Sequence, residues 1–153
     1  MEKRIFKILM WIYLVSLLFF VVLKFNGSFE EIIMLHYRII ENEKMGVENI
    51  NLVPFRTISS YMSDIMEFYA LKNIAGNIIV FAPLGFLTSQ VFDKRFLTSA
   101  IICILIILFI ECVQLIFKIG FFDVDDIFLN LIGCLSGICI SLFYNNVDKN
   151  RAK

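Results

Sequence analysis

Four long apolar blocks separated by polar segments dominate the hydrophobicity pattern of the chain, at about 5–23, 74–92, 97–117 and 125–144. Each block has roughly the 20 residues that an α-helix needs to cross a hydrocarbon core of about 30 Å. The pattern predicts an all-α polytopic membrane protein with four transmembrane helices in a single membrane domain over residues 1–153. Pro83 lies inside the second block, where neighbouring helices can satisfy the carbonyl group that a proline frees.

The long segment between the first two blocks carries two apolar stripes at helical spacing. The first stripe consists of Phe29, Ile32, Ile33, His36 and Ile40. The second follows Pro54 and consists of Ile58, Tyr61, Met62, Ile65, Phe68 and Tyr69. We expect a partly helical loop that lies in the membrane interface or folds over the bundle. Thr57, Ser59 and Ser60 are candidate helix caps.

Positive charges near the ends of the blocks predict the orientation of the chain. The basic residues on one predicted side are Lys3, Arg4, Lys7, Lys94, Arg95, Lys149, Arg151 and Lys153. Fewer lysine and arginine residues flank the blocks on the other side. Because cytoplasmic loops carry the excess of lysine and arginine, we expect a protein of the cell membrane with both termini in the cytoplasm and the long loop outside.

The composition narrows the possible partners. Hydrophobic residues make up 59% of the chain and charged residues only 18%, against about 25% charged in soluble domains. The formal net charge is zero, from 14 basic and 14 acidic residues, so a nucleic-acid partner is not expected. The four cysteines lie in apolar blocks without a CxxC pair, and His36 is the single histidine, so we expect no metal site and no cofactor, and place His36 at the surface.

Several polar residues lie inside the predicted spans, where ionisable groups are costly. Glu111 is 14 residues beyond Leu97, which places it ~21 Å along its helix and ~9 Å from the outer face. The same arithmetic places Asn130 ~7.5 Å and Asn77 ~5 Å below that face. Three predicted helices therefore place polar groups at one level. Gln114 shares a helical face with Glu111.

The fourth block carries a polar stripe that continues into small residues. Asp123, Asp126, Asn130, Gly133 and Gly137 fall within about 80° of one another at ~100° per residue. The spacing of the two glycines lets another helix approach closely. We predict a four-helix bundle with a polar cup that opens outward beneath the long loop.

Glu111 in such a cup requires a proton or a cationic partner. The candidate partners are Arg56, Lys118 and Lys72. Arg56 follows the apolar turn 52–55, which is able to dip into the interface.

Three stretches carry a resemblance to a known family. They are residues 51–58, residues 77–86 with Asn77, Pro83 and Gly85, and Glu111 with Gln114 followed by 123–126, Asn130, Gly133 and Gly137. In their order and spacing the chain resembles the VanZ-like family of small bacterial membrane proteins. The family often has an arginine near Phe121 or Phe122, which this chain lacks.

The resemblance implies a link to glycopeptide resistance, with teicoplanin as the associated drug, and no established reaction. On this basis we expect a cell-envelope protein that binds an amphiphile, either a lipid-linked wall precursor or a lipophilic glycopeptide. The expected functional residues are Arg56, Asn77, Glu111, Gln114, Asp123, Asp126 and Asn130. The expected helix-packing residues are Pro83, Gly85, Gly133 and Gly137.

Three other functions remain open. An intramembrane enzyme would use Glu111 and Asp126 as an acid/base pair on a lipid-linked substrate. No serine or cysteine can be matched with a histidine as a nucleophile, so the sequence favours a protein without catalysis. A structural membrane subunit would use the glycines and amides for packing. A transporter or channel is less favoured, because there is no inverted repeat.

Overall fold

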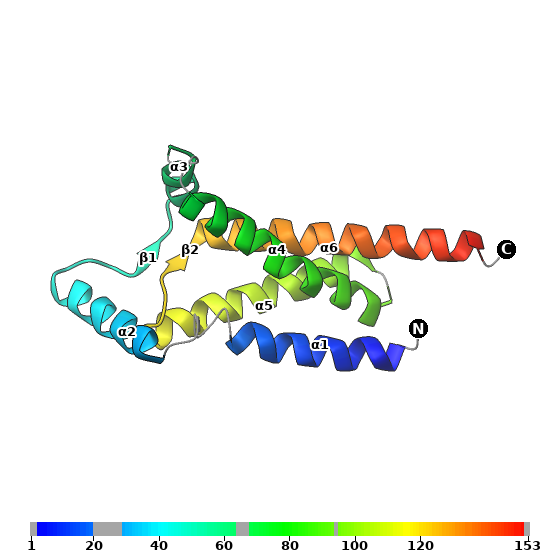
Figure 1. Ribbon diagram of the computed structural model, residues 1–153, viewed down its shortest axis with the longest axis horizontal. Helices are drawn as coiled ribbons and strands as arrows, with labels where there is room; N and C mark the ends of the chain where they lie inside the picture. The colour runs from blue at the N-terminus through cyan, green and yellow to red at the C-terminus, as the bar shows by residue number, and fades with distance from the viewer. Residues whose placement is uncertain (1–2, 20–28, 64–67, 94, 152–153) are drawn as a thin grey trace.

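Six helices and two short strands form the part of the chain that the computed structural model describes, residues 3–19, 29–63, 68–93 and 95–151. In chain order they are α1 (Lys3–Leu17), α2 (Phe29–Lys44), β1 (Ile50–Asn51), α3 (Arg56–Ser63), α4 (Phe68–Val91), α5 (Phe96–Ile116), β2 (Phe122–Asp123) and α6 (Val124–Arg151). In Figure 1, α1, α4, α5 and α6 run lengthwise and successive members point in opposite directions. At one end lie α2, α3 and the strands, which we call the loop end; α1 begins and α6 ends at the other.

Three of the described helices are long and apolar enough to cross a membrane. These spans are Asn73–Val91, Phe96–Ile116 and Val124–Tyr144, within one residue of the second, third and fourth predicted blocks. The chain is therefore a multi-pass α-helical membrane protein. In α1 the structure has 15 helical residues, and residues 20–23 of the first predicted span lie outside the described part. The fourth crossing and the orientation of the termini stay predictions.

Close contact between the backbones of α4 and α6 forms the centre of the bundle. A Cβ atom added at Gly85, Gly133 or Gly137 would lie less than 3.0 Å from the backbone of the other helix. Such an approach is possible only where both helices have small or absent side chains. Around it, Phe81 and Leu84 of α4 pack with Ile107 of α5 in the main buried cluster.

Helix α1 packs along α4. Phe6 forms a buried cluster with Leu87 and Val91 near the start of α1. The hydroxyl of Tyr13 donates a hydrogen bond to the carbonyl of Val80. Pro83 has no N–H group to donate to the carbonyl of residue 79, four positions earlier in α4. The hydrogen bond from Tyr13 binds the adjacent carbonyl, so a neighbouring helix contacts α4 in the turn before the proline.

The structure departs from the all-α prediction in one place. Strands β1 and β2 pair in parallel, with Ile50 opposite Phe122 and Asn51 opposite Asp123. Asp123 therefore lies in a strand before α6 and not on the helical stripe predicted for it. Two-residue strands have too few positions for an alternating pattern, so the sequence offers no periodicity for them.

The two amphipathic stripes also differ in detail from the prediction. In α2 the fully buried residue is Ile39, while Phe29 and Ile33 are exposed, so the buried face is rotated from the predicted stripe. Helix α3 ends at Ser63, and Phe68 and Tyr69 belong to the beginning of α4. Ile65 lies outside the described residues. The predicted second stripe thus joined residues of α3 to residues of α4, since α4 begins at Phe68, before its membrane-spanning portion starts at Asn73.

Candidate polar site at the loop end

Asp125 caps helix α3 from a different element of the fold. Its carboxylate accepts hydrogen bonds from the backbone N–H groups of Phe55, Thr57 and Ile58, at 2.6, 2.8 and 3.0 Å. The first N–H groups of a helix have no partner within the helix, and a carboxylate is well suited to satisfy them. Asp125 is 0% exposed, so this cap is an internal part of the structure.

Asp123 accepts a second set of hydrogen bonds beside the cap. Its carboxylate binds the Thr57 hydroxyl at 2.6 Å, the Asn51 side-chain amide at 3.1 Å and the backbone N–H of Asp125 at 2.9 Å. The pairing of β1 with β2 places Asn51 directly opposite Asp123. Asn51, Thr57, Asp123 and Asp125 thus form one connected group, which we call the aspartate cluster.

An exposed apolar turn covers the aspartate cluster. Residues 52–55 form this turn, and Phe55 is 62% exposed with a positive φ of 64°. Its ring stacks on Phe128 of α6, with centroids 6.0 Å apart and planes 8° from parallel. The two stacked rings add exposed apolar surface at the loop end of α6. The hydrogen bond from the Phe55 amide to Asp125 holds the turn in this position.

Deeper in the bundle, a polar contact near the loop end joins α4 to α6. The side-chain amide of Asn77 donates a hydrogen bond to the carboxylate of Asp126 at 2.8 Å. Both residues lie near the loop end of their spans, Asn77 in Asn73–Val91 and Asp126 in Val124–Tyr144. The sequence had placed Asn77 at the level of Glu111 and Asn130, and Asp126 on the same helical stripe as Asn130; the structure brings Asn77 and Asp126 together.

Glu111, Gln114 and Asn130 are enclosed by the bundle, with exposed fractions of 3%, 5% and 2%. The Gln114 side chain lies against Gly120, where an added Cβ would fall 3.1 Å from it. The Oδ1 atom of Asn130 has no hydrogen-bond partner among the described residues. The three side chains are thus buried, and α3 with the turn before it is held over the start of α6 by the aspartate cluster; their assignment to a ligand-binding cup stays a prediction.

The cations proposed as partners of Glu111 have other surroundings. Lys118 pairs with Glu43 of α2. Arg56 is exposed at the first position of α3 and forms no ion pair within the described part of the chain. The side chain of Lys72 lies outside the described residues. Arg56 is thus a solvent-accessible cation beside the aspartate cluster.

His36 connects α2 to the end of α5. Its Nδ1 atom lies 3.2 Å from the carbonyl oxygens of both Phe117 and Lys118. Lys118 has a positive φ of 54°, and the N–H of Ile119 bonds the Gln114 carbonyl at 3.0 Å, the pattern of a Schellman termination. The sequence predicted a surface histidine, whereas the half-buried ring has a defined role at a helix end.

Asp125, Asn51 and Thr57 were not among the predicted functional residues. Asp125 stands at the start of a helix, where an aspartate is usually explained by its own helix. No local pattern indicates that it caps a helix about 70 residues earlier in the chain. No group of three or more histidine, cysteine or acidic side chains in the described residues is arranged to hold a metal ion.

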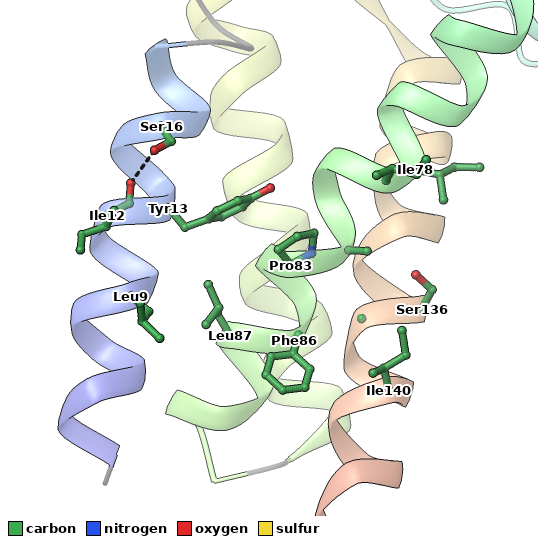
Figure 2. Close-up of a pocket in the computed structure, with 13 residues that line it drawn as sticks. Leu9, Ile12, Tyr13, Ser16, Ile78, Pro83, Phe86, Leu87, Ser136 and Ile140 are labelled. Carbon is green, nitrogen blue, oxygen red and sulfur yellow. Dashed lines mark hydrogen bonds between the residues drawn. The ribbon is translucent and has the colours of Figure 1, made fainter. Parts of the chain in front are cut away.

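An apolar groove lies further along the bundle than the Asn77–Asp126 contact, and neither of these two residues lines it. It has a volume of about 690 Å³ and lies between α1, α4 and α6. Ile78, next to Asn77, marks its upper part, and Leu9 and Ile140 lie further along it (Figure 2). Tyr13 reaches across the groove from α1 toward α4 in the same view. Polar groups are thus followed along α4 by space with hydrocarbon walls.

These features define a multi-pass α-helical membrane protein with a polar cluster at one end of its bundle and an apolar groove leading away from it. The chain belongs to the VanZ/LLP1 family, whose model matches residues 10–145. It is similar to Protein VanZ of Enterococcus faecium, with 26% identity over 139 residues that cover 90% of this chain and 74% of that protein. No solved structure matches the chain significantly.

Proposed function

We propose that this protein is a cell-envelope membrane protein that contributes to resistance against glycopeptides of the teicoplanin type by binding an amphiphile at its loop end. Membership of the VanZ/LLP1 family supports the link to resistance. The amphiphile is a lipid-linked wall precursor or a lipophilic glycopeptide, both of which combine a polar headgroup with a hydrocarbon chain. We expect this end of the bundle to lie outside the cell, because the excess of lysine and arginine flanks the other end.

The position of the apolar groove supports this proposal most directly. A hydrocarbon chain fits a space of about 690 Å³ walled by leucine, isoleucine and phenylalanine side chains. The groove includes Ile78, which follows Asn77 along α4, so in this proposal the headgroup of a chain held in the groove extends toward the Asn77–Asp126 contact. The same ligand therefore meets apolar walls and polar groups in the order that an amphiphile presents them.

Arg56 provides the charge for an anionic headgroup. It stands exposed at the start of α3, and a guanidinium group binds phosphate or carboxylate through paired hydrogen bonds. The aspartate cluster positions Arg56, since Asp125 and Asp123 hold the N-terminal turn of α3. In this proposal Asn77 and Asp126 contact the headgroup, and Glu111, Gln114 and Asn130 support them from inside the bundle.

Drug susceptibility of a deletion strain complemented with matched variants tests the proposal. Arg56→Gln removes the headgroup cation, and Arg38→Gln removes an equally exposed arginine of α2. Ser16→Trp fills the groove, whereas Val15→Trp introduces the same side chain on an exposed face outside it. We expect Arg56→Gln and Ser16→Trp to lower resistance to teicoplanin at equal protein abundance, and the two controls to retain it.

Unchanged susceptibility with both test variants would refute binding at this end of the bundle. The side of the membrane is tested separately by a cysteine introduced as Glu48→Cys, at an exposed position of the loop end. A membrane-impermeant maleimide added to intact cells is expected to label this variant above the background of the native cysteines. Labelling only after lysis would place the loop end in the cytoplasm and remove the basis for an outer-leaflet ligand.

One observation favours a second candidate function, a structural membrane subunit. The carboxylates of Asp123 and Asp125 are buried and fully engaged in holding α3, which is a packing role. For a structural subunit, Arg56→Gln would leave resistance unchanged while Gly137→Ala, which disturbs the contact between α4 and α6, would abolish it.

A further inference from the structure

A second polar hollow lies at the opposite end of the bundle from the aspartate cluster. It has a volume of about 530 Å³ and is lined by the first turns of α1, the end of α4 and the connection to α5. Because one candidate span ends at Val91 and the next begins at Phe96, the hollow lies at the boundary of the hydrocarbon core. This is the end at which α1 begins in Figure 1.

Three cations and one carboxylate face this hollow in the described structure. The cations are Lys3, Lys7 and Arg95, and the carboxylate is Asp93. Lys3 donates a hydrogen bond to Asp93 at 2.6 Å. That bond, followed by the charges of Lys3, Arg95 and Lys7, lowers the pKa of the Asp93 carboxyl below its ordinary value. One carboxylate thus faces three cations, which leaves an excess of two positive charges.

Apolar side chains complete the wall on the side of the membrane. Met10 and Phe92 line the hollow together with Trp11, which is 66% exposed. Tryptophan is enriched where the headgroups of a bilayer meet its hydrocarbon. A ligand that fits this arrangement carries a negative charge at the polar end and hydrocarbon immediately beside it.

We propose that this basic hollow is a binding site for the phosphate headgroup of an anionic glycerophospholipid. Lys7 and Arg95 bind the phosphate, while Lys3 remains paired with Asp93 and closes one side of the site. Basic pockets between transmembrane helices commonly hold such headgroups. Free phosphate has the same charge but does not use the apolar wall, so the lipid is the ligand that both parts of the hollow recognise.

This site is independent of the amphiphile proposed at the loop end. It lies at the other end of the bundle, and no residue is shared between the two. A failure of one proposal therefore leaves the other unaffected.

Lipid retention by the purified full-length protein tests the site. The protein is reconstituted with an equimolar mixture of phosphatidylglycerol and phosphatidylcholine, extracted in a neutral detergent, and its retained lipid is counted by native mass spectrometry. We expect phosphatidylglycerol to be enriched in the wild type. Lys7→Gln together with Arg95→Gln is expected to abolish the enrichment, since each cation near a lipid surface accounts for up to about fivefold.

The matched control removes two positive charges elsewhere, by Arg38→Gln with Lys44→Gln on α2, where neither residue lines the hollow. This control is expected to retain the enrichment. Should the double test variant not fold, each single variant is expected to give an intermediate ratio. Enrichment that persists in the test variants, or loss of equal size in the control, would overturn the proposal. Equal protection from thermal unfolding by soluble glycerol phosphate would also overturn it, because that outcome identifies a site for free phosphate.

Discussion

Replacing Asp125 tests whether the loop end is held by one buried carboxylate. Asp125→Ala removes the acceptor for three backbone N–H groups, those of Phe55, Thr57 and Ile58. The amide of Thr57 and that of Ile58 belong to half-buried residues, whereas Phe55 is exposed. Water is able to replace the acceptor at Phe55 but not fully at the other two, so the first turn of α3 is expected to open.

The magnitude follows from the two half-buried amides. A buried donor without its acceptor costs about 1–3 kcal/mol, and loss of a helix cap costs about 0.5–2 kcal/mol. Since these figures describe overlapping effects, we expect Asp125→Ala to destabilise the α3 turn by roughly 3 kcal/mol. Asp125→Asn keeps one oxygen acceptor and is expected to cost roughly half as much.

Hydrogen exchange measured by mass spectrometry reports this change locally. A peptide covering residues 52–60 is expected to exchange about 100-fold faster in Asp125→Ala, because each 1.4 kcal/mol corresponds to a factor of about ten. Peptides from the centre of α5 serve as an internal reference. Glu41→Gln, an acidic residue exposed on α2, controls for the loss of one negative charge.

Two outcomes would refute the reasoning. Exchange at 52–60 that is unchanged in Asp125→Ala would show that the cap does not hold the turn. A uniform increase over all described helices would show that Asp125 supports the whole bundle and not the loop end specifically. The intermediate position of Asp125→Asn separates loss of the hydrogen bonds from loss of packing volume, because asparagine has nearly the same shape.

Three further predictions concern the other contacts of the bundle. Gly137→Ala is expected to lower the free energy of unfolding in detergent by about 1–3 kcal/mol, because the added methyl group would contact the α4 backbone. Gly76→Ala, which has open space around it, is expected not to destabilise the protein. Equal effects of the two substitutions would contradict the close approach of α4 and α6. The pKa of Asp93 is lowered, chiefly by the hydrogen bond from Lys3. The stabilisation that this carboxylate contributes to the folded protein is therefore complete at pH values above its ordinary pKa. It is lost as the pH falls through the lower pKa of the folded state. Melting curves from about pH 5 to about pH 3 should show this loss in the wild type but not in Asp93→Asn, and high salt should reduce it. His36→Leu is expected to cost about 1 kcal/mol by removing the contact with the end of α5, which His36→Gln should partly restore in the same unfolding assay.

The spans were predictable because the membrane imposes a length and a composition that single residues cannot disguise. The helices at Asn73–Val91, Phe96–Ile116 and Val124–Tyr144 match the predicted blocks for this reason. The spacing of Gly133 and Gly137 likewise predicted a close helix contact, since a missing side chain at every fourth position has one plain structural use. What the pattern could not give was the partner, which the structure identifies as α4.

The aspartate cluster was not predictable, because its members come from two segments about 70 residues apart in the chain. The pairing of Asn51 with Asp123 depends on two strands of two residues each, which carry no periodic pattern. The predicted polar cup rested on the matching depths of Asn77, Glu111 and Asn130 and on the cost of polar groups in a membrane. That cost is equally well met when the polar groups are buried and hydrogen-bonded, and Asp123 and Asp125 meet it in this way.

Neither Phe121 nor Phe122 supplies a cation beside Asp123 and Asp125, and the structure satisfies both carboxylates with neutral donors. Asp123 and Asp125 each accept three hydrogen bonds, from backbone N–H groups, the Thr57 hydroxyl and the Asn51 amide. The N–H groups at the start of α3 carry partial positive charge and therefore stabilise the Asp125 carboxylate. Phe122 is then free to pair with Ile50, and Arg56 does not have to neutralise these acids. Its guanidinium group is left exposed, where an anionic headgroup is able to reach it.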